Sequence, residues 1–180
     1  KRILRAVDIL SRQGIANPIL LGNPKEIVRE ANKLKLKLKG VQIINHLKSP
    51  KIDVYAERFH QLREKKGLTL KEAKKLIKEG IYFGTMMVYM GDADGLISGA
   101  VNTTAHTIRP ALQIIKTKKK FHKVSGLFLI LKDKKIYLFA DAAVIVDPTA
   151  KELAEIAIDS AETAKKFGIK PKIAMLSFST

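Results

Sequence analysis

The sequence has 180 residues and a formal net charge of +17, because 34 lysines and arginines outnumber 17 aspartates and glutamates. A hydrophobic fraction of 46% is enough for a substantial core, so the composition argues against a disordered chain. The absence of cysteine excludes disulfide scaffolds, cysteine-ligated zinc and thiol nucleophiles. No apolar run approaches the ~18 residues of a membrane span, and a chain without cysteine fits a reducing compartment, so we expect a cytoplasmic protein.

The excess of positive charge makes nucleic acid the first partner to consider. The basic residues are mostly lysines spread along the chain, and only 6% of the residues are aromatic. Neither a stacking platform nor a helix-turn-helix, zinc-finger or RNP pattern is present. The sequence therefore favours solvated lysine faces that attract small, highly charged anions. Nucleic-acid binding stays an alternative, which predicts an affinity that falls steeply with salt.

The first part of the chain alternates between helical and strand patterns. The spacing predicts an amphipathic helix over 1–13, stopped by a glycine, and a second helix beginning at Pro24. Short apolar strands are predicted within 17–23 and 41–46. This alternation builds a parallel sheet covered by helices, so we expect an α/β fold. The apolar stripe of the first helix is Ile3, Leu4, Val7 and Leu10.

The middle of the chain is predicted to be helical. One helix over 53–67 ends at its terminal glycine. The next begins at Thr69, where Glu72 three places on completes a capping box. The apolar run 81–91 has no decisive period, but its length favours a buried helix.

The last part of the chain predicts a hairpin, a long helix and a final strand. Two apolar runs joined by a charged "KDKK" turn indicate antiparallel strands over 123–141. The helix over 147–168 is capped by Asp147 or Thr149 and leads to a buried strand at 172–180. The buried stripe of that helix is Leu153, Ile156 and Ala157.

A lysine cluster at 116–123 separates the helix-rich part from the hairpin-containing part. We therefore predict a first α/β domain over 1–117, which carries the anion-binding residues, and part of a second over 118–180. The sequence opens without methionine inside a helical period and stops on a strand with nothing after it. We expect these residues to be a piece of a longer chain.

The stretch "SGAVNTTAHTIRPALQIIKT", residues 98–117, is the best candidate for a ligand site. The residues "DGLISGA" at 94–100 predict a short strand, and small residues and hydroxyls then precede a helix. A strand, turn and helix in this order leave backbone N–H groups free to bind an anion, and an arginine fork suits phosphate. The predicted binding residues here are Ser98, Gly99, Thr103, Thr104 and Arg109.

A purely structural interpretation of the same stretch is that Asn102 or Thr103 caps the helix while Arg109 pairs with a surface carboxylate. The chain has neither a Walker loop nor a GxGxxG turn, so ATP and NAD sites are not indicated. Three acidic residues are candidate acids or bases, although each is also explained by local structure: Asp92, Asp94 and Asp141. The histidines are too scattered to predict a metal site: His46, His60, His106 and His122.

Three blocks of the sequence, 55–73, 81–117 and 147–180, resemble the phosphate acetyl/butyryltransferase family. The similarity runs along the whole chain, is most specific in the second block, and favours the acetyl-transferring over the butyryl-transferring members. Malic enzymes carry a related C-terminal domain, but there the counterpart of "NTTAHTIRP" is usually altered.

The resemblance implies a three-layer α/β/α fold of two domains, similar to isocitrate and isopropylmalate dehydrogenases, with the second domain incomplete here. It also implies an active site in the cleft between domains and a homodimer when the protein is full length. The expected reaction moves an acetyl group between coenzyme A and inorganic phosphate, with no tightly bound cofactor and no metal. The alternative is a non-catalytic regulatory domain that binds acetyl-CoA or another anion, as in malic enzymes.

In the family, arginines in a "QLRxxKG" block and in "TIRP" are implicated in coenzyme A binding, and they match Arg63 and Arg109. The base, serine and arginine of the transfer step lie beyond the counterpart of "MLSFST", so the resemblance assigns no catalytic residue here. We therefore expect these residues alone to be inactive. One departure lies near 143–145, where the family often has a cysteine or asparagine.

Overall fold

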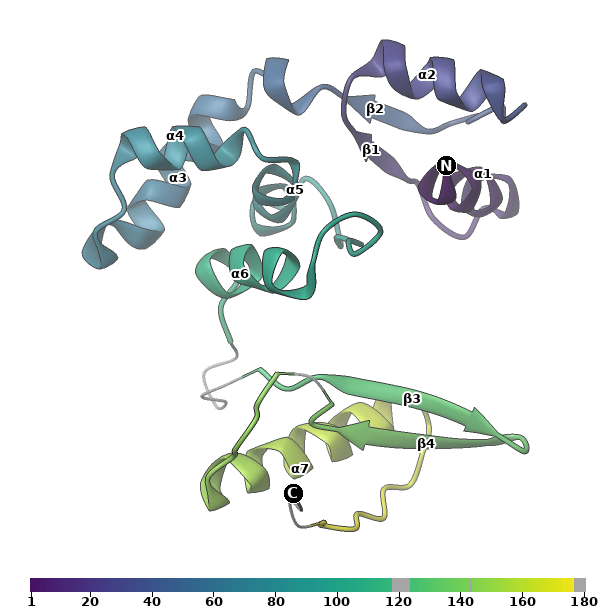
Figure 1. The fold of residues 1–180 in the computed structure, drawn as a ribbon, viewed down its shortest axis with the longest axis vertical. Helices are drawn as coiled ribbons and strands as arrows, with labels where there is room; N and C mark the ends of the chain where they lie inside the picture. Colours follow the sequence, from purple (N-terminus) through teal and green to yellow (C-terminus); the bar gives the residue numbers. More distant parts are fainter. Residues whose placement is uncertain (118–123, 143, 177–180) are drawn as a thin grey trace. The chain divides into compact units, whose positions relative to one another are not determined.

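The structure is a computed structural model that describes residues 1–117, 124–142 and 144–176. The chain divides into two compact units, Lys1–Lys116 and Thr117–Thr180. Both units combine helices and strands, which is the mixed α/β content expected from the sequence (Figure 1). The expected domain limits and their assigned roles stay a prediction, and the lysine cluster falls largely on 118–123, outside the described residues.

The first unit opens with two helices and two short strands. The strands are parallel, with Leu20 opposite Ile43, which confirms the predicted pairing direction. Gly14 ends the first helix with a φ of 64°, and the Asn23 side chain caps the second helix, which begins at Pro24 as expected. These elements are α1 (Arg2–Gln13), β1 (Ile19–Leu21), α2 (Pro24–Lys33) and β2 (Gln42–Ile44).

A small hydrophobic cluster holds α1 against the strands. Leu4 and Val7 are buried together with Leu20, and the leucines between the lysines at 34–38 pack over them. Only part of the predicted apolar stripe is buried, because the side chain of Ile3 is 46% exposed. The buried carboxylate of Asp8 instead occupies part of that face, where it accepts a hydrogen bond of 2.9 Å from Arg12.

The helices predicted in the middle of the first unit are present. Thr69 and Glu72 form the expected capping box, in which the Glu72 N–H donates to the Thr69 hydroxyl at 3.2 Å and the Thr69 N–H donates to the Glu72 carboxylate at 2.9 Å. Gly67 stops the preceding turn with a φ of 83°. The elements are η1 (His46–Lys48), α3 (Ile52–Arg63), η2 (Glu64–Lys66), α4 (Leu70–Ile77), α5 (Gly80–Tyr89) and α6 (Thr104–Ile114).

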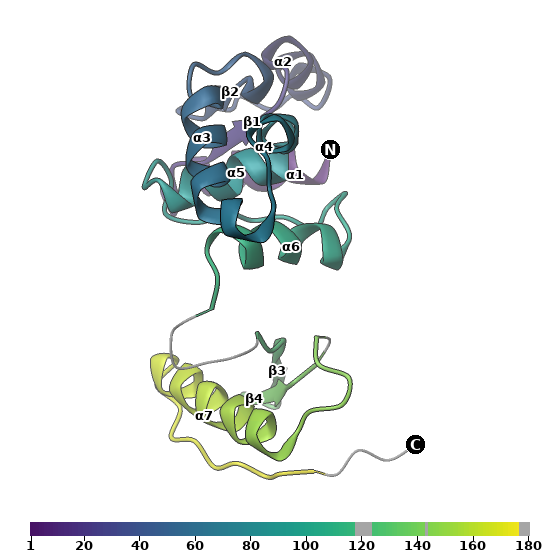
Figure 2. The same ribbon diagram turned by 90° about the vertical axis from the view of Figure 1, so that its left-hand side faces the viewer.

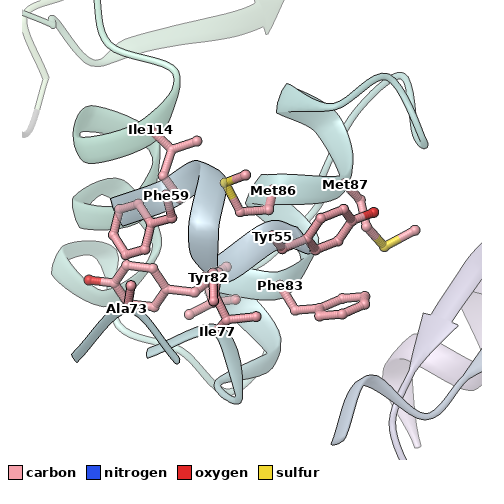
Figure 3. Packing of buried hydrophobic residues seen from close by; sticks show 11 residues of the cluster. Tyr55, Phe59, Ala73, Ile77, Tyr82, Phe83, Met86, Met87 and Ile114 are labelled. Atoms are coloured by element: carbon pink, nitrogen blue, oxygen red, sulfur yellow. The ribbon is translucent and has the colours of Figure 1, made fainter. Parts of the chain in front are cut away.

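Helix α5 lies inside the main core, and all residues from Ile81 to Met87 are buried. Figure 2 shows its neighbours α3, α4 and α6, and Figure 3 shows side chains of α5 packed with those of its neighbours. The length argument for a buried helix at 81–91 is therefore confirmed. Gly84 permits close approach from outside the helix, because a Cβ there would lie 2.9 Å from a methyl of Leu96 and 3.2 Å from one of Leu21.

The predicted strand at 94–100 is wrong. Residues 95–99 have no regular structure, and Gly99 has a φ of 110°, outside the strand region. The carbonyl of Ala100 accepts a hydrogen bond of 2.9 Å from the Arg2 guanidinium instead of pairing with a neighbouring strand. The candidate site therefore follows a loop that side chains hold in place.

The second unit contains an antiparallel hairpin and one long helix, both as predicted. Strands β3 (Leu127–Lys132) and β4 (Lys135–Ala140) pair antiparallel, and α7 (Ala150–Lys166) follows. Thr149 is the cap of α7, and it forms a capping box with Glu152.

Two details of the second unit differ from expectation. On α7 the buried residues are Ile156 and Ala164, whereas Leu153 and Ala157 of the expected stripe are only half-buried. The final strand does not form over 172–176, and 177–180 lie outside the described residues. Among the described residues, none of the helices combines the length and hydropathy that crossing a membrane would require.

The burial of Ile77 predicts that its truncation destabilises the first unit. Its side chain is 0% exposed and packs in the α3–α5 cluster, so Ile77→Ala should lower the free energy of unfolding by about 2–5 kcal/mol. Urea denaturation followed by circular dichroism measures this change. Ile3→Ala is the matched control and should change stability by less than ~0.5 kcal/mol; equal effects of the two substitutions would contradict this core.

Candidate functional site

The loop between α5 and α6 places several of the predicted site residues. The Ser98 hydroxyl lies 3.1 Å from the Thr107 hydroxyl, and the Asn102 amide donates a hydrogen bond of 3.1 Å to it. Gly99 follows in a conformation that side chains rarely adopt. These contacts hold Ser98 beside the first turns of α6.

Thr103 and Thr104 occupy the start of α6, and they differ in role. Thr103 is the N-cap, and its hydroxyl accepts a hydrogen bond of 3.3 Å from the His106 N–H. The capping interpretation therefore holds for Thr103, whereas Asn102 contacts Ser98 instead. Thr104 is the first residue of the helix and is exposed.

Arg63 and Arg109 come from different helices, and the positive charges of both affect the pKa of one residue, Tyr82. Arg63 ends α3 and is half-buried, and Arg109 lies in α6 and is exposed. Burial and then the charge of Glu79 raise the pKa of the Tyr82 hydroxyl, whereas the positive charges of Arg109 and Arg63 lower it. Both guanidinium groups therefore lie close enough to Tyr82 to interact with it electrostatically.

Neither guanidinium forms an ion pair or hydrogen bond with another of the described residues. The expected alternative, in which Arg109 pairs with a surface carboxylate, is not found within that part of the chain. Two permanent positive charges close to one hydroxyl are an arrangement that can bind a multiply charged anion.

Sequence reasoning missed Tyr82 and Gln113. The Tyr82 hydroxyl donates a hydrogen bond of 2.8 Å to Gln113 Oε1, and its ring lies 5.6 Å from that of Phe59 between centroids (Figure 3). Helical spacing could have pointed to Gln113 and to Phe59, the ring partner of Tyr82. Gln113 lies four residues after Arg109 and Phe59 four residues before Arg63, so each shares a helix face with one arginine.

Two of the three candidate acids, Asp92 and Asp141, have structural partners. Asp92 accepts hydrogen bonds from the Lys51 ammonium and from the buried Tyr55 hydroxyl, and these two contacts hold its pKa below the usual range. Burial, followed by the contact with Asp92, raises the pKa of Tyr55. In the second unit, Asp141 accepts hydrogen bonds from three backbone N–H groups, among them Val144 at 3.0 Å.

The histidines in the described residues lie in separate places. His46 packs beside Gly80 and Phe83, and the Nδ1 atom of His60 lies 2.8 Å from the Leu68 carbonyl oxygen. His106 is in α6, and His122 lies outside the described residues. The described residues include no group of three or more metal-ligating side chains of the His, Cys, Asp and Glu type.

The chain belongs to the family described as phosphate acetyl/butaryl transferase, whose sequence profile matches residues 1–180. This confirms the family predicted from the three sequence blocks. Among curated proteins, it is 49% identical over 180 residues to the phosphate acetyltransferase of Nitratidesulfovibrio vulgaris, covering 100% of this chain and 26% of that protein. It is 47% identical to the phosphate acetyltransferase of Corynebacterium glutamicum, covering 99% of this chain and 54% of that protein.

Two solved structures are also similar. A phosphotransacetylase from Streptococcus pyogenes has a TM-score of 0.92 at 48% identity, covering 99% of this chain and 55% of that one. The EutD phosphotransacetylase from Staphylococcus aureus has a TM-score of 0.89 at 42% identity, covering 99% and 54%. The chain thus spans from about a quarter to about half the length of the proteins it matches.

His46 predicts a pH dependence of stability. Burial lowers the pKa of its imidazole, and a backbone hydrogen bond to Lys78 opposes that effect only in part. The unfolded chain therefore takes up a proton at a higher pH than the folded one, and stability falls as the pH falls through about 6.5. Below the folded-state pKa the loss stops.

The measurement is the melting temperature at pH 7.5 and pH 5.5 for the wild-type protein and for His46→Gln. We expect the variant to lose about 2–4 °C less than the wild type on acidification, because glutamine does not titrate. Equal losses in the two proteins would show that the His46 site does not disfavour the protonated ring.

Proposed function

We propose that this protein catalyses the reversible transfer of an acetyl group between coenzyme A and inorganic phosphate, giving acetyl phosphate. The observation that carries the proposal is the pair Arg63 and Arg109 near Tyr82, neither of which has an ion-pair partner among the described residues, within a chain of this family. The relatives named phosphate acetyltransferase support it, because they match over nearly the whole of this chain.

The chemistry of coenzyme A suits this pair of arginines. The substrate carries a diphosphate and a separate phosphate, and a guanidinium offers each of them a planar, permanently charged donor fork. We assign Arg63 and Arg109 to coenzyme A. We assign the smaller acetyl phosphate to the hydroxyls and the backbone around Ser98, Gly99, Thr103 and Thr104.

The proposed reaction is a direct transfer with both substrates bound. A carboxylate takes the thiol proton, the sulfur forms a bond to the acetyl carbon, and the bond from that carbon to the phosphate oxygen breaks, so that phosphate leaves. The family resemblance assigns the base and the charge-stabilising serine and arginine to a segment that follows the counterpart of this chain. We therefore assign binding and orientation, and not proton transfer, to the residues described.

Three further features belong to the same proposal. The fold is the three-layer α/β/α arrangement of the isocitrate and isopropylmalate dehydrogenases. The full-length protein is a cytoplasmic homodimer. It uses coenzyme A as a substrate and holds no tightly bound cofactor. The two-stranded parallel pair β1–β2 and the likeness to phosphotransacetylase structures support the fold.

The direct test is acetyl-CoA formation from acetyl phosphate and coenzyme A by the complete natural protein. Turnover is expected. Stabilisation by coenzyme A without turnover would overturn the proposal in favour of a regulatory module. Binding of single-stranded DNA that falls steeply with salt and ignores coenzyme A would favour nucleic-acid binding instead.

Arg109→Ala in that protein should raise the KM for coenzyme A by about tenfold or more, with kcat changed by less than about threefold, because a ground-state contact to phosphate is lost. Steady-state kinetics with coenzyme A varied at saturating acetyl phosphate measures both constants. Arg58→Ala is the control, because Arg58 already contacts Gln61 and Tyr89 on the surface. An unchanged KM in Arg109→Ala would remove Arg109 from the site.

A further inference from the structure

Tyr82 is the point at which three helices of the first unit meet. It belongs to α5, its ring packs against Phe59 of α3, and its hydroxyl donates to Gln113 of α6. The side chain is only 5% exposed, and most of its neighbours in the cluster are apolar (Figure 3). A hydroxyl in such a place needs a hydrogen-bond acceptor, and Gln113 supplies it.

Helical spacing connects this contact to the two arginines. Side chains four residues apart on a helix share a face, so Phe59 shares a face with Arg63, and Gln113 shares one with Arg109. The same tyrosine therefore contacts α3 and α6 on the faces that carry the two guanidinium groups. Their charges both reach the Tyr82 hydroxyl, as this placement requires.

Helix α6 has a particular need for a side-chain anchor. Pro110 lies inside it, fully buried, and a proline cannot donate the backbone hydrogen bond of that turn. Ile114 holds one side of the helix in the core. The Tyr82–Gln113 hydrogen bond restrains the neighbouring position, one turn after Arg109.

We propose that Tyr82 and Gln113 are positioning residues for coenzyme A: their hydrogen bond sets the spacing between Arg63 and Arg109, and so the fit of the two arginines to a polyphosphate ligand. The inference rests on the proposed function. Neither side chain is assigned a contact with the substrate, and the apolar packing of the Tyr82 ring accounts for its burial without its hydroxyl.

The test uses Tyr82→Phe, which keeps the ring and removes the hydroxyl, and Gln113→Met, which keeps the length and removes the acceptor. In the complete natural protein, each should raise the KM for coenzyme A by about threefold to tenfold, while kcat and the KM for acetyl phosphate change by less than about twofold. Tyr89→Phe is the matched control, because Tyr89 lies on the same helix and its hydroxyl accepts a hydrogen bond from the surface residue Arg58 and not from α6.

The double variant separates positioning through this bond from independent effects. If both residues act through one hydrogen bond, Tyr82→Phe combined with Gln113→Met should raise the KM for coenzyme A no more than either alone. An increase in KM in the double variant that equals the product of the two single increases would overturn the inference. So would an unchanged KM for coenzyme A in both single variants, or a lower melting temperature with only kcat reduced, which indicates a structural role alone.

Failure of the proposed function is distinguishable from failure of this inference. Absence of turnover in the wild-type protein would count against acetyl transfer. Calorimetric titration with coenzyme A then still tests the positioning role, because the two variants should weaken binding by the same threefold to tenfold if the bond sets the arginine spacing.

Discussion

The first unit depends on burying α5 on every side. An amphipathic helix needs partners on one face, but a helix whose residues from Ile81 to Met87 are all buried needs them all around. Helices α3, α4 and α6 and residues of the parallel strands supply that cover. The few polar groups of α5 must then find partners inside the protein, because water does not reach them.

Those partners are the link between the core and the candidate site. The Thr85 hydroxyl donates back to the Ile81 carbonyl at 2.7 Å, within the helix. The Tyr82 hydroxyl instead donates its hydrogen bond to Gln113 on the neighbouring helix α6. Requirements of packing therefore bring a side chain of α5 next to the faces from which Arg63 and Arg109 project. The two arginines of the site stand on helices, which hold their charges more firmly than a loop would.

The loop from α5 to α6 shows a different way of holding residues in place. Its first part is tied to α3, where Tyr55 and Lys51, the residue just before the helix, donate to Asp92. Further along, Ser98 is tied to Thr107 of α6, and the carbonyl of Ala100 accepts a hydrogen bond from Arg2 on α1. These side-chain bonds replace the strand pairing that we expected at 94–100, so the segment stays irregular and still has defined positions.

What the sequence determined by itself was local. Capping residues such as Thr69 and Thr149, the glycine stops, the hairpin and the type of each long helix follow from contacts within a few residues, which periodicity and turn chemistry report. Arg109 was also within reach as a candidate, although Arg63 came only from family resemblance. Only the tertiary structure showed that 94–100 forms no strand and that Ile3 is exposed. It also brought Tyr82 into contact with Gln113, although the two residues are 31 positions apart. Such features depend on which surfaces meet after folding, and a local pattern carries no information about its distant partner.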